Sequence, residues 1–134
     1  MSRLRLRIAA VLIAAALATP TIADDRVPTA QKASLQVAMQ QHIDRSVVNG
    51  KFLHLDTKTG QVEPLHPVTA HPMIMLMGEH CVLCADFRDR NGKPVNIDFY
   101  MARRGQSYIV FHTAVAERAI LERLMESGRV KPAG

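Results

Sequence analysis

The apolar positions of residues 29–47 repeat with the period of an α-helix. They form one stripe, because side chains three and four residues apart lie on the same face of a helix. Thr29 is the expected N-cap, and Asn49-Gly50 is the expected end because both residue types tolerate a left-handed backbone. The stripe consists of Leu35, Ala38, Met39, Ile43 and Val47.

From Lys51 the pattern changes to short extended segments separated by turn residues. Residues 56–60, with the sequence DTKTG, and the pair Asn91-Gly92 are turn signals that predict two β-hairpins. Residues 66–72 are expected to form a loop, because the proline in each of its two His-Pro pairs removes an amide donor. The expected strands are residues 52–56, 61–65, 73–88 with a bend at Gly78, 95–101 and 107–112.

A second helix is expected near the C-terminus. Thr113 is its expected N-cap, and Gly128 is the residue at which it should stop. Its apolar stripe consists of Ala116, Ile120, Leu121, Leu124 and Met125. The connections between the strands are all short, which favours an antiparallel meander of about five strands. We therefore expect an α+β fold with an N-terminal helix, the meander and a C-terminal helix, both helices packing on one face of a single sheet.

The first 23 residues have the layout of a signal peptide. Arg3, Arg5 and Arg7 precede Ile8 to Ala18, an uncharged apolar run of eleven residues. This run is well short of the roughly 20 residues that a membrane-spanning helix needs, so no permanent membrane span is expected. We expect export to the periplasm, with residues 24–134 forming one small domain.

Small side chains at Thr21 and Ala23 favour cleavage of the signal peptide between Ala23 and Asp24. Cleavage after Ala18 is the alternative. Removal of the three leader arginines lowers the formal net charge from +5 to +2. A charge this small gives no electrostatic basis for binding nucleic acid. The expected partner is another periplasmic protein or an inner-membrane protein.

Residues 66–84 combine histidine, methionine and cysteine, and these residue types suggest a soft-metal site. Thioethers, imidazoles and thiolates suit Cu(I), which an exported protein can meet. Copper is thus the one cofactor that the sequence suggests. The candidate ligands are His71, Met73, Met75, Met77, His80, Cys81 and Cys84.

The two cysteines allow two further interpretations. The spacing Cys81-Val82-Leu83-Cys84 is that of a redox dithiol, but the surrounding pattern is that of a strand and not of a helix N-terminus. A structural disulfide would need a turn or bulge at Val82-Leu83, because residues three apart in a regular strand point to opposite faces. We favour two separate small hydrophobic residues. Covalent c-type haem is excluded, because Ala85 and not histidine follows Cys84.

No sequence motif of a hydrolase or metalloprotease is present, so an enzyme is the less favoured class. The sequence favours a small exported binding or accessory protein, with copper binding or thiol redox chemistry through residues 66–84 as the alternative. Tyr100 and Tyr108 are expected on the outward face of neighbouring strands, where a partner can bind. Asp98 and His112 complete this candidate binding surface.

Overall fold

A computed structural model describes residues 26–134 of the chain. The expected signal peptide and its cleavage site at Ala23 and Asp24 lie outside the described residues. Helix α1 (Thr29–Ser46) buries Leu35, Ala38, Met39 and Ile43, which are four of the five residues of its predicted stripe. The fifth, Val47, follows the helix and packs against the same core from β1.

Seven strands form one antiparallel sheet, and its six main strands are neighbours in chain order, as in a meander. The short last strand pairs with β3 instead. The strands are β1 (Val47–Val48), β2 (Lys51–Asp56), β3 (Gln61–Met77), β4 (His80–Arg88), β5 (Pro94–Arg104), β6 (Ser107–Val115) and β7 (Lys131–Pro132). The α+β prediction with an antiparallel sheet is therefore correct, whereas the expected number of strands was too low.

The two strands that were not expected are β1 and β7, and two turns change the strand boundaries. Asn49 and Gly50 have φ of 51° and 78°, and they form the two-residue connection of a β1–β2 hairpin instead of a simple helix stop. Gly78, with φ of 59°, and Glu79 form an equally tight connection between β3 and β4, where a bend within one strand was expected. Both turns use a residue type that adopts positive φ at little cost.

Residues 66–72 are part of β3, so the prediction that they form a loop was wrong. The two His-Pro pairs do not break the strand but coincide with two register irregularities, between Pro67 and Thr69 and between Ala70 and Ile74. Proline is tolerated in strands at such irregularities, where a ladder hydrogen bond is already missing. As a result β3 pairs first with β2 through residues 61–65 and then with β4.

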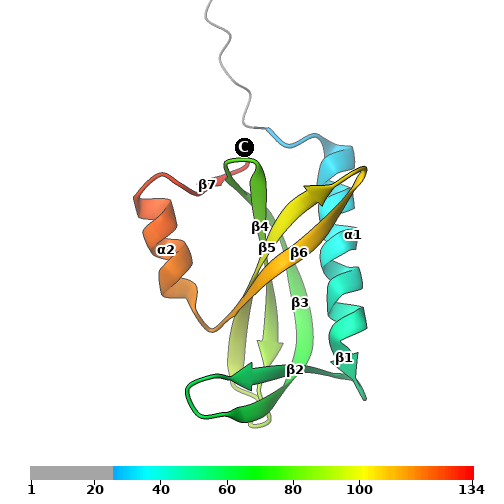
Figure 1. The fold of residues 1–134 in the computed structure, drawn as a ribbon, viewed down its shortest axis with the longest axis vertical. Helices are drawn as coiled ribbons and strands as arrows, with labels where there is room; N and C mark the ends of the chain where they lie inside the picture. The colour runs from blue at the N-terminus through cyan, green and yellow to red at the C-terminus, as the bar shows by residue number, and fades with distance from the viewer. Residues whose placement is uncertain (1–25) are drawn as a thin grey trace, which may run out of the picture.

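The two helices cover opposite faces of the sheet, as Figure 1 shows with α1 on the right and α2 (Arg118–Glu126) on the left. The prediction that both lie on one face was wrong. We call the cluster that contains α1 the α1-face core; it includes Leu35, Met39, Ile43, Phe52, Leu65, Leu83, Phe87, Ile97, Phe99 and Met101. The α2-face core consists of Met75, Val82, Cys84, Tyr100, Ala114, Leu121 and Val130.

Helix α2 is short and is anchored by one fully buried side chain, Leu121. It begins at Arg118, because β6 extends through Val115 and includes Thr113, the residue expected as the N-cap. Gly128 follows the helix end closely, as expected. No helix in residues 26–134 is long and apolar enough to span a membrane.

Docking of α2 through Leu121 predicts a stability difference between two neighbouring positions. Leu121→Ala should lower the free energy of unfolding by about 3 kcal/mol, because it leaves a cavity in the α2-face core. The matched control Ile120→Ala, at an exposed position of the same helix, should cost less than about 1 kcal/mol. Urea denaturation measures both, and equal costs would contradict this packing of α2.

Candidate functional site

Residues 66–84 lie along β3, the Gly78-Glu79 turn and the first half of β4. Alternate side chains of a strand point to opposite faces, and Met75 and Met77 pack in or against the α2-face core. Met73 precedes Ile74, where the regular pairing with β4 resumes after the irregularity that begins at Ala70. Met75 is buried and Met77 is half-buried, but Met73 is 57% exposed. Met75 and Met77 therefore share the α2 face, whereas the regular alternation that would place Met73 beside them is interrupted.

Cys81 and Cys84 are free cysteines on opposite faces of β4. Cys81 belongs to the α1-face core and Cys84 to the α2-face core. The pairing of β4 with β5 is continuous from Cys81 to Arg88, so no turn or bulge at Val82-Leu83 brings the two sulfur atoms together. Each cysteine therefore serves as a small hydrophobic residue in its own cluster.

Burial raises the pKa of both thiols. The pKa of Cys84 is raised to about 12, first by burial and then by the neighbouring Asp98 carboxyl group. Burial also raises the pKa of Cys81, against the opposing effect of the Arg103 charge. The thiolate is the form that attacks disulfides and binds metals, and these thiols carry almost none of it at neutral pH. Neither thiol redox chemistry nor thiolate ligation of copper gains support from this arrangement.

The two candidate histidine ligands lie at opposite ends of the same strand pair. His71 Nε2 is 2.8 Å from Asp86 Oδ2, and the His80 ring packs against Phe111 with 5.3 Å between the ring centroids. Asp86 and His80 are six residues apart on β4, or about 20 Å along the strand. Within residues 26–134, no cluster of three or more His, Cys, Asp or Glu side chains is arranged to hold a metal ion.

The four residues of the expected binding surface do not share an exposed face. Tyr100 and Tyr108 are both buried, Tyr100 in the α2-face core and Tyr108 in the α1-face core. Asp98 is also buried, and only His112 is exposed, with its ring packed against Tyr100 at a centroid distance of 5.6 Å. The expected outward position of the tyrosines was wrong, because α2 covers the face of β5 that carries Tyr100, and Tyr108 on β6 packs into the α1-face core.

Asp98 is the one charged side chain that is fully buried among the described residues. Its Oδ1 atom lies 3.1 Å from Nη2 of Arg118, the first residue of α2. Arg118 also donates a hydrogen bond to Asn96 Oδ1, and Asn96 Nδ2 donates to Asp86 Oδ1 at 3.2 Å. With the His71–Asp86 contact, a continuous series of polar contacts connects α2 to β5, β4 and β3.

These polar contacts and the burial around them shift the pKa values of Asp86 and Tyr100. The hydrogen bond with His71, and next that with Asn96, holds the pKa of Asp86 below its ordinary value. Burial, and then the charge of Asp98, raises the pKa of Tyr100. The Asp98 carboxylate oxygens and the Tyr100 hydroxyl have no hydrogen bond of normal geometry within residues 26–134, and all three atoms are sealed from solvent. A substrate cannot reach them without displacement of α2, so the arrangement serves to hold the helix.

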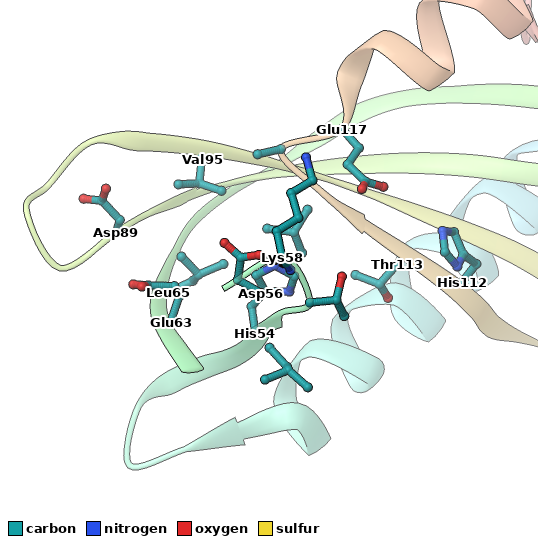
Figure 2. Close-up of a pocket in the computed structure, with 14 residues that line it drawn as sticks. His54, Asp56, Lys58, Glu63, Leu65, Asp89, Val95, His112, Thr113 and Glu117 are labelled. Carbon is teal, nitrogen blue, oxygen red and sulfur yellow. Dashed lines mark hydrogen bonds between the residues drawn. The ribbon is translucent and has the colours of Figure 1, made fainter. Parts of the chain in front are cut away.

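An open cleft of about 610 Å³ lies between the β2–β3 hairpin and the C-terminal part of β6. Figure 2 shows side chains that enter it from two sides: His54, Asp56 and Lys58 from the hairpin, and Thr113 and Glu117 from β6 and its end. The cleft is lined by His54, Leu55, Asp56, Thr57, Lys58, Glu63, Leu65, Asp89, Val95, His112, Thr113, Val115, Ala116 and Glu117.

The inner part of the cleft is apolar and its rim is charged. Leu65, Val95 and Val115 belong to the α1-face core or pack against it, and they provide the apolar surface. Ala116 adopts a φ of 54°, unusual for alanine, and its N–H donates to Asn96 O at 2.9 Å where the chain leaves β6 for α2. Sequence patterns do not reveal this cleft, because its two sides are more than 50 residues apart in the chain.

Acidic side chains outnumber basic ones at the rim of the cleft. The four carboxylates are those of Asp56, Glu63, Asp89 and Glu117, and the basic side chains are Lys58, His54 and His112. Three of the carboxylates also have local structural roles. Asp56 and Asp89 accept backbone N–H groups of their own turns, at 2.8 Å from Lys58 N and Asn91 N respectively, and Glu63 pairs with Arg90 at 3.3 Å. The bond from Lys58 N is the main reason why the pKa of Asp56 is lowered.

The buried ion pair predicts a clear effect of Arg118→Ala. Loss of the guanidinium leaves the Asp98 carboxylate buried without a counter-charge, and we expect the free energy of unfolding to fall by about 2 kcal/mol, less than for a fully buried pair because Arg118 is partly exposed. The added substitution Asp98→Asn should recover part of this loss. Urea denaturation measures both changes.

Arg123→Ala, on the exposed side of α2, is the control and should change stability by no more than about 0.5 kcal/mol. An equal effect of Arg118→Ala and Arg123→Ala would contradict the role of the ion pair in holding α2.

Comparisons with known proteins identify no relative of this chain. No protein-family model, no curated protein and no solved structure matches it. Its function therefore has to be argued from the geometry of its own residues.

Proposed function

We propose that this chain is a small exported binding or accessory protein without a catalytic site, and that the cleft between the β2–β3 hairpin and β6 is where its partner binds. The observation that carries the proposal is the cleft itself, a concave surface of about 610 Å³ with an apolar interior and a charged rim. Binding sites commonly combine these two features, since apolar contacts provide affinity and a few polar groups fix orientation. The signal-peptide layout of the N-terminal sequence is what supports the proposed export to the periplasm.

The arrangement of reactive groups supports binding over catalysis. Both thiols are buried and protonated, and the Asp98 carboxylate is sealed beneath α2. At the cleft, Asp56 and Asp89 already accept hydrogen bonds from their own turns. General acid–base catalysis needs a carboxylate or imidazole that can exchange protons with a bound substrate, and Asp56, Asp89 and Asp98 are not free to do so. Glu117, His54 and His112 also line the cleft and are available for contact with a binding partner.

Site-specific cross-linking tests the location of the binding site. We expect a photo-reactive p-benzoylphenylalanine at Thr113, within the cleft, to form a covalent adduct with a partner when the full precursor is expressed and exported. The same group at Glu122, an exposed position of α2 away from the cleft, is the matched control and should give no such adduct. Adducts are detected by mass spectrometry of the purified protein. Identical adducts at both positions, or none at Thr113, would refute the proposed site.

Soft-metal binding is the second candidate, and one feature of the register favours it. Met77 and His80 are direct partners at the end of the β3–β4 hairpin, and Met75 is the next residue on the same face as Met77. Two thioethers and an imidazole are ligands that suit Cu(I). In this arrangement the cysteines contribute nothing, because Cys81 lies on the other face and Cys84 is buried and protonated.

Cu(I) titration against a competing chelator tests this candidate. If the hairpin end binds copper, the protein takes up one Cu(I), and Met77→Leu with His80→Gln lowers the affinity at least tenfold. Met39→Leu, in the α1-face core, is the control for loss of a methionine elsewhere and should leave the affinity unchanged. Absence of stoichiometric uptake by the unaltered protein would exclude copper binding.

A further inference from the structure

Two strand edges without a strand partner border the cleft. The strands β1 and β6 end the sheet, and β1 pairs only with Phe52 and Lys51 of β2, so the outer edge of β2 from Leu53 to Asp56 lacks a neighbouring strand in the described part of the chain. The outer edge of β6 likewise has no strand beside it there. Residues 54–56 of β2 and residues 112, 113 and 115 of β6 all line the cleft. Helix α1 packs against β6, so the edge of β2 is the one at which backbone groups are available to a further strand.

The edge of β2 is unusually apolar for an exposed strand. Leu53 and Leu55 are 45% and 55% exposed, and Val62, the register partner of Leu55 on β3, is 53% exposed. Natural proteins commonly protect an exposed strand edge with charged residues or proline, because an apolar edge attracts another strand. The outer face of the hairpin, which carries Leu53, Leu55 and Val62, is therefore apolar next to the edge where an added strand would lie. The opposite, inner face of the hairpin meets the apolar interior of the cleft.

The charges of the cleft indicate which added strand would fit. Four carboxylates and one lysine line it, and Arg90 pairs with one of the carboxylates, Glu63, at 3.3 Å. Glu117 is exposed at the rim near Lys58, as Figure 2 shows. This local acidic excess is complementary to lysine or arginine side chains of a partner, and complementary potentials govern both encounter and specificity.

We propose that the cleft accepts an extended peptide segment of a partner protein, rich in basic and β-branched residues, which adds as a strand to the free edge of β2. The proposal rests on the proposed function, since it names the kind of partner that the cleft binds. Main-chain hydrogen bonds to residues 53–56 provide affinity, and alternate side chains of the peptide face the cleft and the apolar outer face of the hairpin. The acidic rim selects for basic residues.

Synthetic peptides test strand addition directly. The probe is a fluorescein-labelled, acetylated peptide of sequence Lys-Val-Thr-Val-Lys-Val-Thr, and its affinity for the protein is measured by fluorescence anisotropy. The matched acidic peptide, with glutamate in place of both lysines, should bind at least tenfold more weakly. Failure of the basic peptide to bind at millimolar concentration, or equal binding of the acidic peptide, overturns the proposal.

Backbone methylation separates strand addition from binding by side chains alone. Two versions of the basic peptide carry N-methyl groups on alternate amides, one on the odd and one on the even positions, so that each loses the donors of one edge. At least one version should bind at least tenfold more weakly than the parent peptide. Undiminished binding of both versions overturns strand addition.

Amide hydrogen exchange and a charge variant localise the added strand. Bound peptide should slow exchange at residues 53–56, and protection confined to another part of the chain overturns the proposal. Glu117→Gln should weaken binding about threefold, as expected for one exposed charge pair. Glu122→Gln makes the same charge change on α2 outside the cleft and should leave the affinity unchanged.

The cross-linking experiment at Thr113 and the peptide-binding experiment fail in distinguishable ways. If Thr113 cross-links to a partner but the basic peptide leaves the β2 amides unprotected, strand addition is wrong and the proposed binding site stands. If Thr113 gives no cross-link and the peptide does not bind, both the proposed function and this inference are wrong.

Discussion

The structure depends on burying a strand that is apolar on both faces. In β4, the run from Cys81 to Ala85 is buried without interruption, and Val82 and Leu83 are completely inaccessible to solvent. A two-sided apolar strand needs cover on both faces, since apolar surface left in water costs about 25 cal/mol per Å². Helix α1 covers one face, and the short helix α2 with Val130 covers the other. The position of α2 therefore follows from β4 and not only from the amphipathic pattern of α2 itself.

Helix α2 also buries polar residues of β5, the strand next to β4. On β5 the polar residues Asn96, Asp98 and Tyr100 point to the α2 face, so closure of that face removes Asp98 and Tyr100 from solvent. Burial of a carboxylate is costly unless a counter-charge accompanies it, and Arg118 at the start of α2 provides that charge. The same ion pair thus holds α2 and gives the Asp98 carboxylate a counter-charge. Closure of this face by α2 also leaves the Asp98 carboxylate and the Tyr100 hydroxyl without access to solvent.

The cleft lies where the β2–β3 hairpin meets the end of β6, and its apolar interior is continuous with the α1-face core. The long strand β3 passes from β2 to β4, and its two register irregularities lie near the prolines, where bending of a strand is expected. The β2–β3 hairpin thereby faces the end of β6 across the cleft, as Figure 2 shows. The sheet does not close, because β1 and β6 remain its two ends. The open sheet leaves the edge of β2 beside the cleft, and this edge is where we propose that a partner binds.

The sequence by itself determined α1 and most of the strands, but not the local structure of residues 66–72. The stripe of Leu35, Met39 and Ile43 predicted α1, and the alternation of Ile97 and Phe99 with polar residues predicted β5, because periodicity depends only on near neighbours. The tertiary structure alone decided that Gly78 ends a strand, that α2 lies opposite α1, and that Asp98, Tyr100 and Tyr108 are buried. The tertiary structure also determined where the cleft lies, because its two sides come from residues 54–58 and residues 112–117. These features depend on which distant segments meet across the sheet, and no periodicity within one segment contains that information.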